Sequence, residues 1–91
     1  MSIALVRGRV MITPAQLRMA RGAIEWSAKD LAEASGVGES TIRRYETGRG
    51  DMFPHNLTAL QSALEKQGVV FLASGETKDG GPGVRLKRKK A

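Results

Sequence analysis

Apolar residues recur at helical spacing from Thr13 onward, and the first such stretch carries clear signals for a helix start. Thr13 precedes Pro14, and Gln16 follows three residues after Thr13. This order is typical of a capping box with proline in the first turn. The positions that share one face of this helix are Leu17, Ala20, Arg21 and Ile24. The pattern therefore predicts a first helix that begins at Thr13.

A second, shorter helix is predicted after Ser27. Ser27 is a good N-cap, and Asp30 stands where a capping box places its reciprocal side chain. Gly36 is suited to end the helix in a left-handed conformation. The expected buried side of this helix comprises Leu31, Ala32 and Ala34.

Two further helices complete the periodic part of the chain. The third is expected from about Glu39 to Thr47, between Gly38 as N-cap and Gly48 as terminator. Its inward positions are Ile42 and Tyr45. The fourth is expected from Asn56, as its cap, to Gln67, with an apolar stripe made of Leu57, Leu60 and Leu64.

The period changes after Gly68. Residues 69–72 form a β-prone run, 75–83 are rich in glycine, and 84–87 alternate apolar and basic side chains. A hairpin is expected here, and isolated hairpins are only marginally stable in water. Hairpins from two chains forming one sheet, a hairpin packed on its own helices, and a frayed tail all remain open.

These elements divide the chain into three parts and predict a mainly α fold. Residues 1–12 form an N-terminal arm, 13–68 a compact helical domain of four to five helices, and 69–91 a β-prone, Gly-rich and basic C-terminal segment. Within 27–49, a short helix, a glycine-containing turn and a second helix with an Arg-rich face predict a helix-turn-helix. The second helix of such a unit can enter the major groove of DNA.

Composition narrows the class of protein. The chain has 91 residues, 41% of them hydrophobic and only 4% aromatic, which suits one small domain with an aliphatic core. It has no cysteine, no apolar run long enough for a membrane span and no convincing signal peptide. A cytoplasmic, nucleoid-associated protein without membrane contact is therefore expected.

The net charge of +6 lies at the two ends of the chain. Residues 1–12 carry two arginines and no acid, residues 76–91 have a net charge of +4, and the middle is close to neutral. Positive ends on a neutral body favour binding to a polyanion. The alternative for the tail is a solvated basic segment. The auxiliary basic residues are Arg7, Arg9, Arg85, Lys87, Arg88, Lys89 and Lys90.

The stretch from Thr13 to Leu64 resembles the Cro/phage-repressor-type (Xre-like) helix-turn-helix family of bacterial and phage regulators. The resemblance lies in residues 17–21, Trp26-Ser27, Leu31-Ala32-Glu33, Ser35-Gly36-Val37 and 41–48. It implies a compact helical bundle that binds operator DNA, mostly as a homodimer. The implied function is a sequence-specific transcriptional regulator of double-stranded DNA, and a repressor in particular.

The resemblance implies base contacts from the exposed side of the third helix, at Glu39, Ser40, Thr41, Arg43 and Arg44. The side-chain chemistry agrees, because Arg donates to guanine O6 and N7 and Glu accepts from cytosine N4. The alternative for Arg43 and Arg44 is a helix face with ion pairs such as Glu39 with Arg43.

The resemblance also implies phosphate contacts and one structural ion pair. The phosphate contacts would come from Ser27, Ala28, Lys29, Thr47 and Arg49. Ala28 and Glu39 depart from the family pattern, in which Gln often occupies the first position and an uncharged polar residue the second. Arg21 and Glu46 match the family's internal ion pair. Trp26 and Tyr45 are expected to pack rather than to stack on bases, and Phe53 either caps the core or enters a dimer contact.

Catalysis is not expected. The single histidine, His55, has no cysteine or second histidine as partner. Residues 80–83 are not a phosphate loop, because Pro82 removes an N–H group and no Gly-Lys-Ser/Thr follows. No metal or cofactor is expected. The competing class is a protein-interaction module, such as a DNA-binding antitoxin whose main partner is a toxin.

Overall fold

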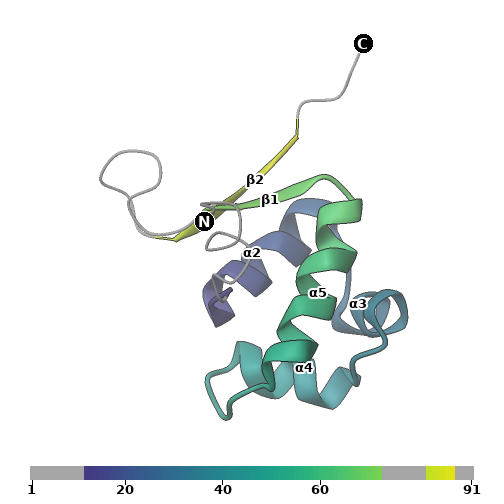
Figure 1. Ribbon diagram of the computed structural model, residues 1–91, viewed down its shortest axis with the longest axis vertical. Coiled ribbons are helices and arrows are strands. Elements are labelled where there is room, and N and C mark those ends of the chain that lie inside the picture. Colours follow the sequence, from purple (N-terminus) through teal and green to yellow (C-terminus); the bar gives the residue numbers. More distant parts are fainter. Residues whose placement is uncertain (1–11, 73–81, 88–91) are drawn as a thin grey trace, which may run out of the picture.

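The computed structural model describes residues 12–72 and 82–87, and Figure 1 shows their arrangement. Four helices and one hairpin make up the described part of the chain, which confirms the mainly α fold with a short C-terminal β element. The elements are α2 (Pro14–Ile24), α3 (Ala28–Ser35), α4 (Glu39–Glu46), α5 (Pro54–Lys66), β1 (Val69–Leu72) and β2 (Gly83–Leu86). The expectations for Arg7, Arg9, Arg88, Lys89, Lys90 and most of the Gly-rich loop lie outside the described residues.

Both predicted capping boxes are present. At α2, the Gln16 N–H donates to Thr13 Oγ1 at 3.0 Å, and the Thr13 N–H donates to Gln16 Oε1 at 2.9 Å. At α3, Ser27 and Asp30 exchange the same two bonds at 3.0 and 2.9 Å. These bonds satisfy N–H groups that a helix start otherwise leaves without a partner, so both starts are set by local sequence.

Two details of the helices differ from the sequence-based expectation. Helix α5 begins at Pro54 rather than at Asn56, and Phe53 is the N-cap residue. Proline favours this start because its fixed φ suits the first helical position and its missing N–H needs no partner there. Ala34 is exposed rather than buried, because the core-facing side of α3 is formed by Ala28 and Leu31.

One hydrophobic core joins all four helices and the hairpin. Leu17, Leu31, Ile42, Leu60 and Leu64 are fully buried and come from α2, α3, α4 and α5. Val69 of β1 is buried in the same cluster. Trp26 and Tyr45 pack against it, as expected. None of the helices in the described ranges has the length and apolar character that crossing a membrane requires.

The hairpin packs on the chain's own helices, one of the three possibilities that the sequence left open. Strands β1 and β2 are antiparallel, with Val69 opposite Leu86 and Leu72 opposite Gly83. The buried Gln16 side chain of α2 donates from Nε2 to the carbonyls of Leu72 and Gly83, each at 2.9 Å. Gln16 therefore serves both the start of α2 and the attachment of the hairpin.

Candidate nucleic-acid interface

The turn between α3 and α4 sets the angle between the two helices. Gly36 ends α3 with φ +81°, a left-handed conformation that costs little without a Cβ. Val37 is buried, and its N–H donates to Ser35 Oγ at 3.1 Å. Gly38 then caps α4 in an extended conformation. A buried apolar residue between two glycines thus orients α4 against α3.

Helix α4 has an inner and an outer face. Ile42 and Glu46 point inward and are buried. Ser40, Arg43 and Arg44 are exposed, while Glu39 and Thr41 are half-buried. The fold therefore places the five expected base-reading side chains along one short helix whose outer side is polar and basic.

Glu39 and Arg43 form an ion pair across one turn of α4. Arg43 donates from Nε and Nη2 to Glu39 Oε2 at 3.0 and 2.8 Å, and the side chains of Arg43 and Glu39 are 61% and 40% exposed. This is the i,i+4 pair that the sequence offered as the alternative for Arg43. A solvent-exposed pair of this kind stabilises a helix by about 0.3–0.5 kcal/mol, so either side chain can be drawn away by a stronger partner.

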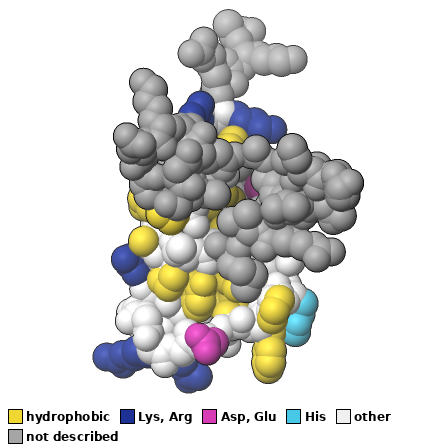
Figure 2. Space-filling view, turned by 60° about the vertical axis from the view of Figure 1, so that its left-hand side comes forward, with side chains coloured by type: hydrophobic (Ala, Val, Ile, Leu, Met, Phe, Trp, Pro, Cys, Tyr) yellow, Lys and Arg dark blue, Asp and Glu magenta, His cyan; other side chains and the backbone are white. Residues whose placement is uncertain are grey.

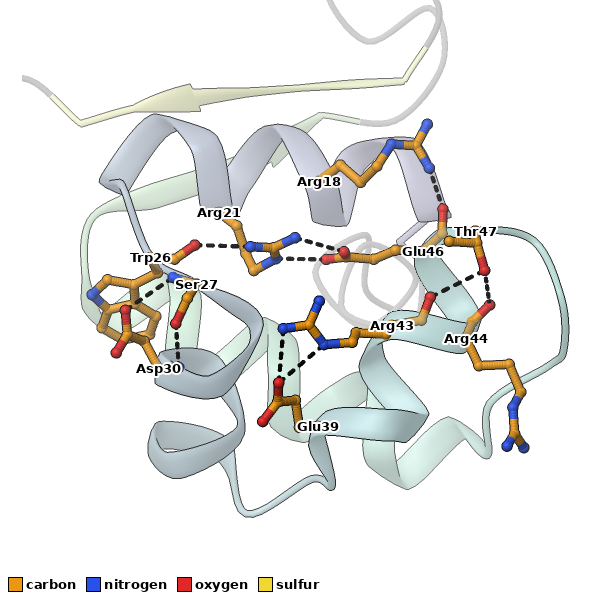
Figure 3. Close-up of polar contacts among 10 residues, drawn as sticks. All are labelled: Arg18, Arg21, Trp26, Ser27, Asp30, Glu39, Arg43, Arg44, Glu46 and Thr47. Carbon is orange, nitrogen blue, oxygen red and sulfur yellow. Dashed lines mark hydrogen bonds and ion pairs between the residues drawn. The ribbon is translucent and has the colours of Figure 1, made fainter.

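Arg44 is oriented differently from Arg43. Its side chain extends away from the ion-paired residues of the site (Figure 3). Within the described part of the chain, no hydrogen bond or ion pair of its guanidinium is found. The donors of an arginine have the fork geometry that suits guanine O6 and N7, and the contacts found among the described residues do not occupy those of Arg44.

A buried ion pair anchors the end of α4 to α2. Arg21 donates from Nε and Nη2 to the two carboxylate oxygens of Glu46, both at 2.7 Å (Figure 3). The Glu46 side chain is only 5% exposed and that of Arg21 22%. Hydrogen bonding to Glu46 raises the pKa of Arg21 above its ordinary value, so this pair does not dissociate by loss of the arginine proton near neutral pH.

Arg21 also reaches the start of α3, because its Nη1 donates to the Trp26 carbonyl at 2.9 Å. One side chain therefore links α2, the segment before α3 and the end of α4. Arg18, one turn earlier on α2, donates to the Glu46 carbonyl. Sequence analysis did not single out Arg18. Its spacing of three residues from Arg21 was the available signal, because such residues share a helix face.

The start of α3 offers fewer phosphate donors than the resemblance implied. The Ala28 side chain is buried, so only its backbone could face a phosphate. The Ser27 hydroxyl accepts from the Asp30 N–H, and the Asp30 carboxylate lies at the helix start. Lys29 is exposed. Lys29 is therefore the side chain of this group that is best suited to reach a phosphate.

The turn that follows α4 holds the other two expected phosphate contacts. The Thr47 hydroxyl lies 3.1 Å from the carbonyls of both Arg43 and Arg44. Thr47 and Arg49 are exposed. The turn is thus tied to the last carbonyls of α4, and the backbone N–H of Arg49 donates to one of them, the Arg44 carbonyl.

The segment before α2 is also tied to α4. The Tyr45 hydroxyl donates to the Ile12 carbonyl at 2.6 Å. Burial raises the pKa of Tyr45 above 10.0, and the negative charge of Asp51 raises it further. The raised pKa means that folding favours the neutral phenol, so its contribution to stability is complete below pH 10.0 and is lost as pH rises through the folded-state pKa.

The hairpin lies at the far end of the molecule from α4 (Figure 1). Arg85 and Lys87 belong to this end. They line a shallow groove of about 430 Å³ with Val70, Leu72 and Leu86. The fold therefore does not bring these two auxiliary basic residues together with the outer face of α4.

Phe53 does not cap the core. It is 70% exposed, and its ring stacks on that of His55 with 5.8 Å between the centroids. Figure 2 shows a histidine beside exposed hydrophobic side chains at the lower end of the molecule, the end where Figure 1 places α4. The expectation that Phe53 caps the core is therefore wrong, and its entry into a dimer contact stays a prediction. No group of His, Asp and Glu suited to a metal ion is found among residues 12–72 and 82–87.

Comparison with known protein families agrees with the helix-turn-helix seen in the structure. A family model described as a helix-turn-helix domain matches residues 15–68, more than half of the chain. The chain belongs to this family, which is of the Xre/Cro-like type. The match spans α2 to α5, and thus includes every described residue of the candidate interface. Comparison with curated proteins found no match.

Proposed function

We propose that the protein is a sequence-specific, double-stranded DNA-binding transcriptional regulator of the bacterial or phage type, and that it represses its target by occupying the operator. The observation that carries this proposal is the outer face of α4, where Ser40, Arg43 and Arg44 are exposed on a helix anchored by buried contacts. A rigid helix with polar and basic side chains suits readout of base edges in the major groove. The proposal includes no catalytic role and no cofactor. We expect the protein to bind DNA of the nucleoid in the cytoplasm.

The roles proposed for the side chains follow from their positions. Arg44 would read a guanine, and Ser40 and Thr41 would adapt to neighbouring base edges. Glu39 would accept from a cytosine amine while it orients Arg43, or release Arg43 to a second guanine. Lys29, Thr47 and Arg49 would contact the phosphates on either side of α4.

Selection of binding sites from random duplex DNA, read by sequencing, tests the proposal. The expected result is an enriched motif that contains G·C pairs and is bound far more tightly than bulk competitor DNA. Recovery of sequences no different from the input library would contradict sequence-specific binding. In that case the same fold would have to serve another kind of partner.

A homodimer is part of this proposal. Two recognition helices must lie about 34 Å apart on one side of the DNA to reach successive major grooves. The exposed Phe53 directly precedes α5, which starts at the α4 end of the molecule (Figure 1), and this position suits an interface that keeps both α4 helices together. A dimer formed through the outer face of the hairpin would separate them, because that element lies at the opposite end of a molecule 34 Å long.

Substitution of Phe53 by aspartate is therefore expected to shift the protein from dimer to monomer in sedimentation velocity experiments. The reason is that an exposed aromatic side chain at an interface contributes through burial, which a carboxylate opposes. The matched control is Leu86→Asp, at a hairpin position that is 48% exposed. Dissociation caused by Leu86→Asp alone would locate the interface at the hairpin instead.

The salt dependence of DNA binding should separate the two groups of basic residues. Arg49→Gln is expected to lower the slope of log K against log salt concentration by about one unit, as loss of one phosphate contact does. Arg85→Gln is expected to leave the slope unchanged, since Arg85 lies at the end away from α4. Titrations by fluorescence anisotropy at several salt concentrations measure both, and equal slope changes would contradict the assigned orientation on DNA.

The second candidate function is that of a DNA-binding antitoxin or protein-interaction module. The groove lined by residues 70, 72 and 85–87 favours it, because apolar side chains together with Arg85 and Lys87 suit an acidic segment of a partner protein. A partner could bind there while α4 occupies DNA. Loss of neutralisation of a co-expressed toxin in Leu72→Asp, with DNA binding intact, would support this function. Full neutralisation by that variant would oppose it.

A further inference from the structure

The loop that follows α4 folds back over the last turn of the helix. Gly48 has φ +75°, and its N–H donates to the Tyr45 carbonyl at 3.0 Å. The Arg49 N–H donates to the Arg44 carbonyl, also at 3.0 Å. These bonds, together with those of the Thr47 hydroxyl, determine where the next residue lies. That residue is Gly50.

Gly50 packs against the aliphatic stem of Arg44. A Cβ added at Gly50 would lie 3.1 Å from Arg44 Cδ and 3.5 Å from Arg44 Cγ. The first distance is shorter than an ordinary van der Waals contact between carbon atoms, so a side chain at position 50 would displace the arginine stem. The backbone of Gly50 does not have a positive φ. The constraint on a side chain at position 50 therefore comes from Arg44, whose stem would have to shift by a few tenths of an ångström, rather than from the backbone.

This contact affects the residue that we propose to read guanine. A free arginine side chain loses much rotamer freedom when it binds, and that loss opposes binding. The Arg44 stem already lies against the loop, and its guanidinium is directed away from the ion pairs of α4 (Figure 3). This side chain therefore loses less rotamer freedom on binding. A base contact also requires the donors to be placed accurately.

We infer that Gly50 is a positioning residue for Arg44: by having no side chain, it lets the loop hold the arginine stem in the orientation that reads a guanine edge. This inference rests on the proposed function and adds a determinant of specificity outside α4. It also assigns a role to a loop residue that would not itself contact a base.

The test is Gly50→Ala, measured on the selected operator and on a random duplex of equal length. Operator affinity is expected to fall roughly three- to tenfold, the effect of ordering one long side chain, and affinity for the random duplex is expected to stay unchanged. The matched control is Gly22→Ala in α2, where an added Cβ meets nothing within 4 Å and φ is not positive. It should leave both affinities unchanged.

A double-mutant cycle separates positioning from a general effect on the loop. In an Arg44→Ala background, Gly50→Ala is expected to change operator affinity less than twofold, because the stem it displaces is absent. An equal loss in both backgrounds would overturn the inference, and so would an unchanged operator affinity of the single variant. Thermal unfolding of each variant checks that all remain folded.

A measurement without DNA keeps this inference distinct from the proposed function. In the free protein, nuclear Overhauser contacts between the Gly50 α protons and the Arg44 δ protons are expected, and Gly50→Ala should change the Arg44 δ shifts. Absence of these contacts would overturn the positioning role even if Arg44 reads DNA. The contacts could instead be present while Arg44→Ala weakens binding to the operator and to random DNA equally. That result would contradict base readout by Arg44, and with it the positioning of Arg44 for readout, although Gly50 would still pack against the arginine stem.

Discussion

Replacing Arg21 with alanine should lower the free energy of unfolding by about 3–5 kcal/mol, the typical effect of breaking one buried ion pair. The cause is the Glu46 carboxylate, which is 5% exposed and would lose both of its 2.7 Å bonds from Arg21. The Trp26 carbonyl would lose a donor as well. Urea denaturation followed by circular dichroism measures the change. Because small domains have total stabilities of about 5–15 kcal/mol, a loss of this size should move the urea midpoint to a clearly lower concentration.

The matched control is Arg43→Ala, which removes an arginine from the other ion pair of the site. That pair is exposed and stays within one helix, so the expected loss is about 0.3–0.5 kcal/mol. Similar losses for Arg21→Ala and Arg43→Ala would contradict the view that burial distinguishes the two pairs. Such a result would mean that Glu46 finds water or another donor when Arg21 is removed.

Replacing Arg44 with alanine should weaken operator binding by about 1–3 kcal/mol, the worth of one bidentate arginine–guanine contact, or about 5- to 150-fold. Binding to random duplex DNA should fall much less, because there Arg44 would act only as one positive charge near phosphates. Fluorescence anisotropy on both duplexes at one salt concentration measures the two losses. Their ratio is the quantity that reports specificity.

Arg43→Ala serves as the comparison for Arg44→Ala on DNA. The substitution removes the same charge one position away on α4, but Arg43 already donates two bonds to Glu39. Moving Arg43 to a base would first cost the roughly 0.3–0.5 kcal/mol of this pair, so we expect a somewhat smaller loss of specificity than for Arg44→Ala. A larger loss from Arg43→Ala would make Arg43, and not Arg44, the principal reader of guanine.

Local sequence predicted the helix boundaries well wherever side-chain caps define them. Thr13 with Gln16 and Ser27 with Asp30 form capping boxes in the structure as the spacing indicated. The start of α5 was predicted less well, because no side-chain cap is present there and proline determines the first position. The expected burial of Ala34 was wrong, because Ala28 and Leu31 form the core-facing side of α3 and Ala34 is exposed.

For the candidate interface too, the sequence predicted the features that depend on local spacing and missed those that depend on tertiary contacts. The outer residues of α4 and the Glu39–Arg43 pair follow from helical spacing, which places i and i+4 side chains on one face. The contact of Gly50 with Arg44 and the bond from Arg18 to the Glu46 carbonyl could not be found this way. They depend on how a loop and a second helix pack against α4.

The amino-acid sequence by itself determined the helices, their caps and the glycines of the central turn, because these depend on side chains only a few residues apart. It also contained the arginines from which a DNA-binding surface is inferred. Only the tertiary structure decided that the hairpin shares the helical core, that Phe53 is left exposed, and that Arg85 and Lys87 lie away from α4. Those outcomes depend on packing between residues distant in the chain, whose relative positions are set by the burial of one common core.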